Sequence, residues 1–556
     1  LAIANAVAFD NNGDLQIGAS TIGSTFTGGV STTAVTGLVT LGGNITAPAG
    51  MTLGTATLIA DTALDSDGGA LTAGTITSND AFALTLDGGS AGTVAVAGLA
   101  NGGDLTILDS GSTTFSGAVN ANTLTLTDTS GTIAVQGDLT VDTALVSQVN
   151  AYSVSLTGAT NTIAGTSTFN NSGTLTLGDG GDALNFTGGV TAAAPSVVNL
   201  NGTVTAAGTA AISLGDADSN VAVSGTSLVG GTSTGAITLA DVDLTDAAQL
   251  TVGTGIANTI SLAGVLGDNG GAGAETLILN TTGAVTATGA IGADGNELDQ
   301  LTVTQSGGMT IQSTLDAESV VLTDTTGTIA FQGNTNIDTG LTTSAEDYAL
   351  SLTGGANSIA GATSILNTGA LTLGDGAGDN SLFVGGLSAT ASEGGIFTAG
   401  TIRTTDQAIT LGNLAGAGSA NTITLNAATT INANDGVVTL ANVTDGAGDF
   451  GLSLQQAGAT GQASIEGSLT VDSLLTFNGA YDVELLGGVT VASDTTFANT
   501  TRVQIGDAAG DTSNFAGGLD TTAVTSTEIA GVVSSGDTQI DLGATTLLDA
   551  ATLDSG

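Results

Sequence analysis

The sequence contains no cysteine, histidine, tryptophan or lysine, and only two of its 556 residues are basic. Without histidine, cysteine and lysine, the chain cannot form the usual nucleophile and base pairs, imidazole metal sites or Schiff bases. Carboxylates and hydroxyls are the remaining reactive groups. Pairs of carboxylates can cleave sugars, but sugar-cleaving clefts usually add aromatic platforms and basic residues, which are scarce here. We therefore expect a protein that is not an enzyme and requires no cofactor.

Acidic residues outnumber basic residues by 50 to 2, which gives a formal net charge of −48 at neutral pH. Nucleic acids and anionic membrane surfaces would repel such a chain. The sequence also lacks an uninterrupted apolar stretch of roughly 18 residues or more, the length that a membrane-spanning helix needs. We thus expect neither nucleic-acid binding nor membrane insertion by this segment. The absence of cysteine fits an exported bacterial protein that folds without disulfides.

Apolar residues alternate with Thr or Ser along most of the chain, as in residues 83–88 (ALTLDG) and 123–129 (TLTLTDT). A period of two predicts β-strands with one buried face. Leu84, Leu105 and Leu124 open equivalent runs that lie 21 and 19 residues apart (105 − 84 and 124 − 105). Short strands that repeat at such distances bury their apolar faces by stacking coil on coil. We predict an all-β, parallel β-solenoid (β-helix) with coils of about 20 residues and essentially no helix.

Longer duplications are superimposed on this coil repeat. Residues 122–192 match residues 318–390, first at a shift of 196 (318 − 122), as in LTDTSGTIAVQG against LTDTTGTIAFQG. A weaker copy covers residues 481–525, and residues 9–30 form a partial copy. We expect one continuous solenoid over residues 1–556, built from these multi-coil blocks and forming a segment of a longer protein. An uncapped solenoid end would expose a sheet edge that pairs with another chain.

One turn carries a pair of acidic residues in three of its four copies, as in LTLGDGGDALNFTGGV of residues 175–190. The partial copy near the N-terminus has Ala19 and Ile22 instead, so the surrounding pattern persists without the acids. We interpret the stretch mainly as a coil corner. Because hard cations bind carboxylate and carbonyl oxygens on flexible turns, the acids are also candidate ligands of an optional Ca²⁺ site. The pairs are Asp179 with Asp182, Asp375 with Asp379, and Asp507 with Asp511.

Further repeated residues have structural interpretations. Asp87, Asp109 and Asp128 each close a strand run. If they stack at the coil spacing of about 4.8 Å, neighbouring carboxylates repel by about 0.9 kcal/mol in water; alternatively, the turns direct them into solvent. We expect stacked amide ladders from several asparagines, namely Asn122, Asn161, Asn171 and Asn357. The phenylalanines that precede a glycine pair are expected in the core or at its corners, namely Phe186, Phe383 and Phe515.

Several stretches resemble the repetitive regions of filamentous-haemagglutinin-like and autotransporter-passenger proteins of bacteria. They are residues 113–143 (TTFSGAVNANTLTLTDTSGTIAVQGDLTVDT), the turn of residues 175–190 and residues 328–339 (TIAFQGNTNIDT). The likeness covers nearly the whole chain and is one of class, shared by many adhesins and surface-layer proteins. It implies a right-handed parallel β-solenoid, export to the bacterial cell surface, and adhesive or scaffolding work.

Composition, repeats and resemblance together predict a non-enzymatic extracellular structural protein. It would be a stiff acidic rod that serves as a fibre subunit, an adhesin stalk or part of a cell-surface layer. Its expected partners are further copies of itself, end to end or laterally, or an unknown surface receptor. The alternative is a calcium-dependent surface or adhesion module whose Asp-Gly loops bind Ca²⁺. Loss of folded structure on addition of a chelator would favour this alternative.

Overall fold

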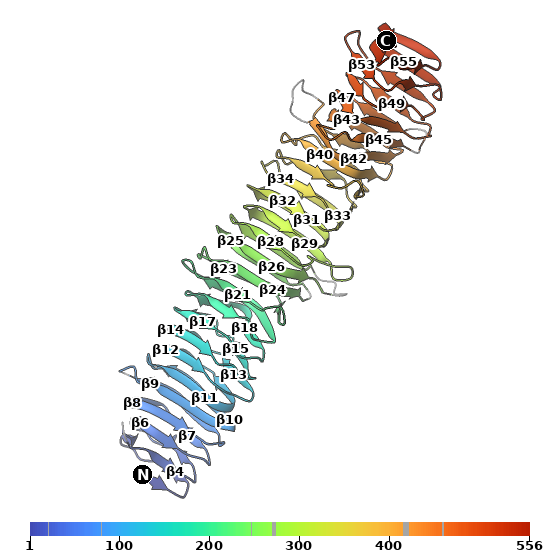
Figure 1. Ribbon diagram of the computed structural model, residues 1–556. Helices are drawn as coiled ribbons and strands as arrows, with labels where there is room; N and C mark the ends of the chain where they lie inside the picture. Colours follow the sequence, from blue (N-terminus) through green and yellow to red (C-terminus); the bar gives the residue numbers. More distant parts are fainter. Residues whose placement is uncertain are drawn as a thin grey trace. The chain divides into compact units, whose positions relative to one another are not determined.

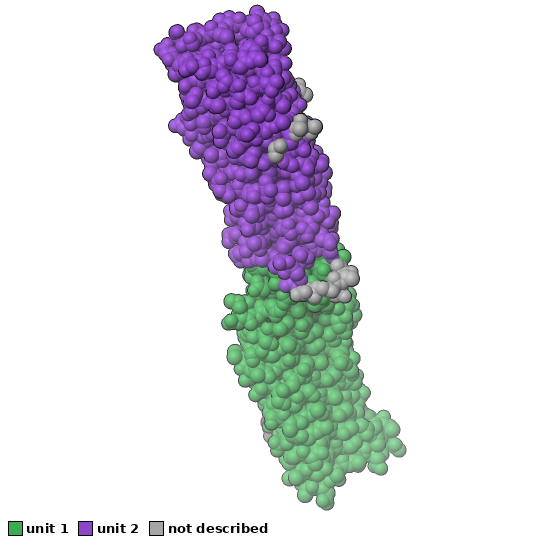
Figure 2. Space-filling view, turned by 90° about the vertical axis from the view of Figure 1, so that its right-hand side faces the viewer, with its two compact units in different colours: residues 1–283 green, residues 284–556 purple. Residues whose placement is uncertain are grey.

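The computed structural model describes residues 1–19, 22–78, 80–245, 247–268, 274–414, 422–456, 458 and 461–556. The chain divides into two compact units, residues 1–283 and residues 284–556 (Figure 2). The described residues contain strands, turns and bends but no helix. Accordingly, no helix of this described part is long and apolar enough to cross a membrane. The prediction of an all-β chain is confirmed.

Each coil of unit 1 contributes short strands that pair in parallel with those of the neighbouring coils (Figure 1). One coil contains three strand segments, residues 105–107, 113–115 and 119–121, which belong to β11 (Leu105–Phe115) and β12 (Val119–Leu126). These segments pair with the matching segments of the next coil, residues 124–126, 133–135 and 139–141. This arrangement is the predicted parallel β-solenoid.

The leucine spacing in the sequence gives the register of the coils. Leu84, at the start of β10 (Leu84–Ala100), pairs with Leu105, and Leu105 pairs with Leu124. All three side chains are buried in the interior, because alternate residues of a strand point to the same face. Successive turns lie roughly 22 residues apart, slightly more than the expected 20.

Unit 2 has the same construction. Its strands include β32 (Thr328–Phe331), β34 (Ala349–Leu352), β37 (Leu371–Leu373), β40 (Ile396–Thr404) and β42 (Thr422–Asn434). One buried aliphatic residue of each strand lies in register with that of the next, which gives the row Ile329, Leu350, Leu371, Ile396 and Ile423. Such rows form a continuous apolar interior. Their side chains are too small to build a globular core for a chain of this size without such stacking.

A buried Tyr–Asn corner recurs once in each of the three repeated blocks. In the first block, Nδ2 of Asn171 donates a hydrogen bond to the carbonyl oxygen of Tyr152 at 3.0 Å, and both residues are buried. Asn367 makes the equivalent bond to Tyr348 and Asn499 to Tyr481, at 2.9 and 3.0 Å. Asn171 therefore satisfies a corner carbonyl inside the coil. The expected stacked amide ladder is not formed at Asn161 or Asn357, because their in-register neighbours are not asparagines: they are Leu139 and Leu184, and Thr335 and Ser381.

The phenylalanines before the glycine pairs also lie in the core. Phe186 packs edge-on against Phe169 with ring centroids 6.3 Å apart, and Phe515 packs in the same way against Phe497 at 6.5 Å. The T-shaped arrangement is one that aromatic pairs prefer. Phe383 is buried at the matching position of the middle block. The prediction that these residues are core or corner residues is confirmed.

Candidate functional site

The paired acids lie together within each turn, and the second acid of each pair binds the backbone of the first. The backbone N–H of Asp179 donates to Oδ2 of Asp182 at 2.8 Å. The N–H of Asp375 donates to Oδ2 of Asp379 at 2.8 Å, as does the N–H of Gly376. A carboxylate that accepts local N–H groups closes a turn in the same way as a helix cap.

The third pair repeats this geometry. The N–H groups of Asp507 and Ala508 donate to Oδ2 of Asp511 at 2.9 and 2.8 Å. Burial raises the pKa of Asp507 above its usual value, and the neighbouring carboxylate of Asp511 raises it further. The first acid of every pair is exposed: Asp179, Asp375 and Asp507.

A glycine with positive φ precedes each acid pair and fixes the turn. Gly178, Gly374 and Gly506 have φ of 81°, 78° and 76°. A Cβ atom at these positions would lie 2.4, 2.4 and 2.5 Å from a backbone carbonyl oxygen of the next coil. Only glycine fits this combination of a left-handed backbone and close approach.

The partial N-terminal copy keeps the turn without the acids. Gly18 has φ of 76°, and a Cβ there would lie 2.0 Å from the carbonyl oxygen of Gly42. Across the turn, the N–H of Ile22 donates to the carbonyl of Ala19 at 3.1 Å. The turn therefore depends on its glycine and its backbone hydrogen bonds, and the acid pair is an addition to it.

The structure brings together the two acids of a pair but no larger set. Within the part of the chain that the structure describes, no three acidic side chains form a group that could hold a metal ion. The pairs lie at separate corners, since Asp182 belongs to β18 (Leu175–Phe186) whereas Asp379 and Asp511 directly precede β38 (Asn380–Phe383) and β53 (Thr512–Phe515). An ion bound there would need backbone carbonyls and water to complete its coordination. The optional Ca²⁺ site remains a prediction.

Comparison with known proteins adds no homologue. Neither family models, nor curated proteins, nor solved structures give a significant match to this chain. The function is therefore inferred from the residues and their geometry.

Unit 1 contains a row of stacked carboxylates. Asp65 pairs in register with Asp87, and Asp87 with Asp109. Burial raises the pKa of Asp109, and the nearby carboxylates of Asp128 and Asp87 raise it further. Burial likewise raises the pKa of Asp65, and the nearby carboxylate of Asp87 raises it further. We refer to Asp65, Asp87, Asp109 and Asp128 as the acid ladder; the register supports stacking of Asp87 on Asp109, one of the two arrangements considered from the sequence.

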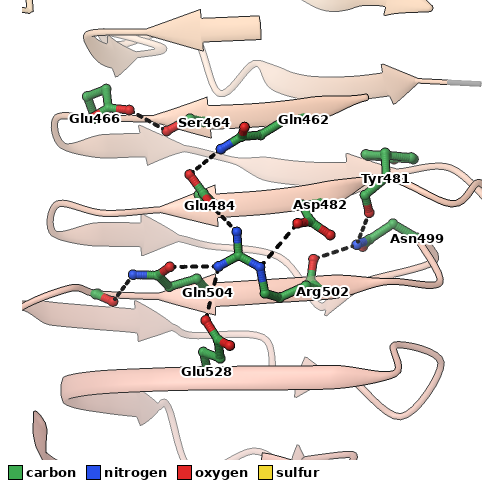
Figure 3. Close-up of polar contacts among 11 residues, drawn as sticks. Gln462, Ser464, Glu466, Tyr481, Asp482, Glu484, Asn499, Arg502, Gln504 and Glu528 are labelled. Carbon is green, nitrogen blue, oxygen red and sulfur yellow. Dashed lines mark hydrogen bonds and ion pairs between the residues drawn. The ribbon is translucent and has the colours of Figure 1, made fainter. Parts of the chain in front are cut away.

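Unit 2 contains a network around one arginine that the sequence did not predict (Figure 3). Arg502, in β52 (Arg502–Ile505), binds Asp482 through Nε at 3.2 Å and Glu528 through Nη1 at 3.0 Å, and its Nη2 binds Glu484. Asp482 and Glu484 belong to β49 (Asp482–Leu485) and Glu528 to β55 (Ser526–Ser535). One guanidinium thus joins three successive strands.

Gln504 completes this Arg502 network by accepting a hydrogen bond from Nη1 at 2.8 Å. Partial burial lowers the pKa of Arg502, but its hydrogen bonds to Glu484, Glu528 and Asp482 outweigh burial and raise the pKa above its usual value. A signal was present in the sequence, because the partners lie about one coil from Arg502, at −20, −18 and +26 residues (482 − 502, 484 − 502 and 528 − 502). These spacings identify the partners of Arg502 only when the register of the coils is known.

Proposed function

We propose that this protein is a non-enzymatic extracellular structural protein, an acidic β-solenoid that serves as a fibre subunit, an adhesin stalk or part of a bacterial cell-surface layer. Its work is mechanical: it carries load and presents a regular acidic surface. It acts through further copies of itself or through a surface receptor, without nucleic acid and without inserting into a membrane.

The observation that supports this proposal is the in-register stacking of buried rows in both units, such as Leu84, Leu105 and Leu124 in unit 1. Within each row, one coil is joined to the next by parallel backbone hydrogen bonds and by contacts between buried aliphatic side chains. Because the same contacts repeat from coil to coil, local opening costs the contacts to both neighbours. That construction resists proteases and deformation without a large globular core.

Two measurements test the structural role. Antibodies raised against the purified chain should label intact producing cells; labelling only after permeabilisation would overturn the extracellular placement. Electron microscopy and light scattering over a range of concentrations should show end-to-end or lateral assemblies. A protein that stays monomeric at every concentration would argue against self-association.

The second candidate function is a calcium-dependent surface or adhesion module. The observation that favours it is the exposed carboxylate of Asp179, Asp375 and Asp507 beside a second acid on the same turn. Adding EDTA and then Ca²⁺ while monitoring circular dichroism and hydrogen exchange at these turns separates the hypotheses. Slower exchange with Ca²⁺, lost in Asp375→Asn, supports the calcium module, whereas identical exchange in EDTA and Ca²⁺ removes it.

A further inference from the structure

A groove crosses five successive strands on the outside of unit 2. Its volume is about 290 Å³, close to the size of a site for a small ligand. The strands are β31 (Leu315–Thr325), β33 (Thr335–Thr343), β35 (Ala356–Ile359), β38 and β40. In-register pairing places one outward residue of each strand along the groove, in the order Asp316, Asn336, Ser358, Leu382 and Arg403.

Arg403 has an unusual position for a chain of this charge. Its Nε donates to Oδ1 of Asn380 at 2.9 Å, which holds the guanidinium at the groove. Among the described residues, no carboxylate forms an ion pair with Arg403, whereas Arg502 binds three. In a chain with 50 acidic residues, a partly buried guanidinium with a neutral amide as its neighbour has its terminal N–H groups available for an external anion.

The other end of the groove offers acceptors and amide groups. Asn336 donates to Oδ1 of Asp316 at 3.0 Å, so that the two side chains form one polar surface. Carboxylate oxygens accept hydrogen bonds from vicinal hydroxyl groups of a sugar, and amide and hydroxyl side chains can both donate to and accept from them. Leu382, between these polar ends, supplies an apolar contact. The distance from Asp316 to Arg403 is four strand spacings, or about 19 Å along the groove.

From this arrangement we infer that the groove binds a short acidic saccharide, with a sugar carboxylate on Arg403 and sugar hydroxyls on Asn336 and Asp316. Arginine binds a carboxylate through two parallel N–H groups. A peptide fits less well, because the groove runs across the strands and provides no free strand edge for a peptide backbone to pair with. The inference goes beyond the structural role and holds whether or not the protein forms fibres.

The test compares two sugars that differ only at the charged group. Saturation-transfer NMR on the full chain at low ionic strength uses methyl β-D-glucuronide as the probe and neutral methyl β-D-glucoside as its match. The glucuronide should bind at least roughly tenfold more tightly, and its binding should weaken as salt is added, since screening acts on the carboxylate. Equal binding of the two sugars, or binding of neither, overturns the inference.

Variants assign the binding to the groove. Arg403→Gln should weaken glucuronide binding by roughly tenfold or more, whereas Arg502→Gln removes the same charge outside the groove and should leave the affinity within about twofold. Asn336→Ala keeps the arginine. Because Asn336 lies three strand spacings, about 14 Å, from Arg403, this variant should leave the glucuronide unaffected and should weaken equally a trisaccharide that ends in glucuronate and its neutral counterpart. Circular dichroism verifies the fold of each variant. Unchanged glucuronide binding in Arg403→Gln, or equally tight binding of a short peptide through its C-terminal carboxylate, would contradict the assignment.

Discussion

The Tyr–Asn corners provide an experiment with internal controls, because the same buried amide occurs in three blocks with different partners. The side-chain oxygen of Asn171 accepts a hydrogen bond from Oγ of Ser147 at 3.2 Å. The corresponding oxygens of Asn367 and Asn499 are buried and have no hydrogen-bond partner among the described residues. Substitution by alanine therefore removes the bond to the tyrosine carbonyl in all three blocks and the acceptor bond only at Asn171. It also removes a second donor bond at two corners, from Asn499 to the carbonyl of Arg502 at 2.9 Å and from Asn171 to that of Thr174 at 3.4 Å.

The expected magnitudes follow from these contacts. Loss of the bond to the tyrosine carbonyl costs about 1 kcal/mol at each corner, and the small cavity adds a similar amount. The carbonyl of Tyr152 retains the N–H of Gly173 at 3.1 Å, which limits the cost. Asn171→Ala additionally leaves the buried Ser147 hydroxyl without its acceptor, at about 1 kcal/mol. Asn499→Ala additionally removes the bond to the Arg502 carbonyl, also at about 1 kcal/mol. We expect about 2 kcal/mol for Asn367→Ala and about 3 kcal/mol for Asn171→Ala and Asn499→Ala.

Hydrogen exchange followed by mass spectrometry is the suitable assay, since a long repeat protein need not unfold in one step and its local opening is the informative quantity. Amides around the corner of Asn367 should exchange faster by roughly 30-fold, for about 2 kcal/mol, and those around Asn171 and Asn499 by a further fivefold or so. Distant coils should be unchanged. Equal acceleration at all three corners, or none, would refute the account of the buried amides.

Three further predictions concern the glycine turns, the Arg502 network and the acid ladder. Gly374→Ala should destabilise its turn by at least about 2 kcal/mol, because it forces alanine into the left-handed region and against a backbone carbonyl. Gly378→Ala is the control and should be nearly neutral, since nothing lies within 4 Å of the added Cβ. Equal thermal denaturation of the two variants would contradict this. Arg502→Gln should accelerate exchange in β49 and β55 by about tenfold, corresponding to roughly 1.4 kcal/mol. The effect should be smaller at high salt, which screens the ion pairs; an effect that grows with salt would contradict this role. In the acid ladder, folding raises the carboxyl pKa values of Asp65 and Asp109. Their coils should therefore be most stable below the unfolded pKa of about 3.9 and lose that stability as pH rises through the folded values. Exchange in residues 84–115 that slows as pH rises from 4 to 7, after correction for intrinsic rates, would contradict this.

The sequence predicted the fold well because the interior of a solenoid repeats. Leu84, Leu105 and Leu124 could be assigned to one row from their spacing, since each coil must place an apolar residue above the previous one. The exact coil length could not be predicted everywhere. Thr203 pairs with Leu228, 25 residues later (228 − 203), because corners accommodate extra residues without disturbing the strands. Contacts between outward side chains depend on these local insertions.

The candidate site shows the same limit. The acid pair was visible in the sequence, but the role of Asp182 as an acceptor of the Asp179 N–H depends on the left-handed backbone at Gly178, which the sequence alone does not specify. The four-residue spacing of Asp375 and Asp379 gives the same contact as the three-residue spacing of Asp179 and Asp182. The carboxylate therefore adapts to the turn, and spacing is a poor guide to chemistry here.

The arrangement of outward residues explains how a chain with net charge −48 can stack its coils. Glu484 pairs in register with Gln504, and Gln504 with Glu528, so that an amide separates the two carboxylates by two strand spacings, about 9.6 Å. Doubling the separation halves their repulsion, from about 0.9 to about 0.4 kcal/mol in water. Asp482 adds a third acid beside this row, and Arg502 lies where the three converge. The acid ladder has neither an intervening amide nor an arginine, and it is therefore the part of unit 1 where salt and pH should have their largest effect.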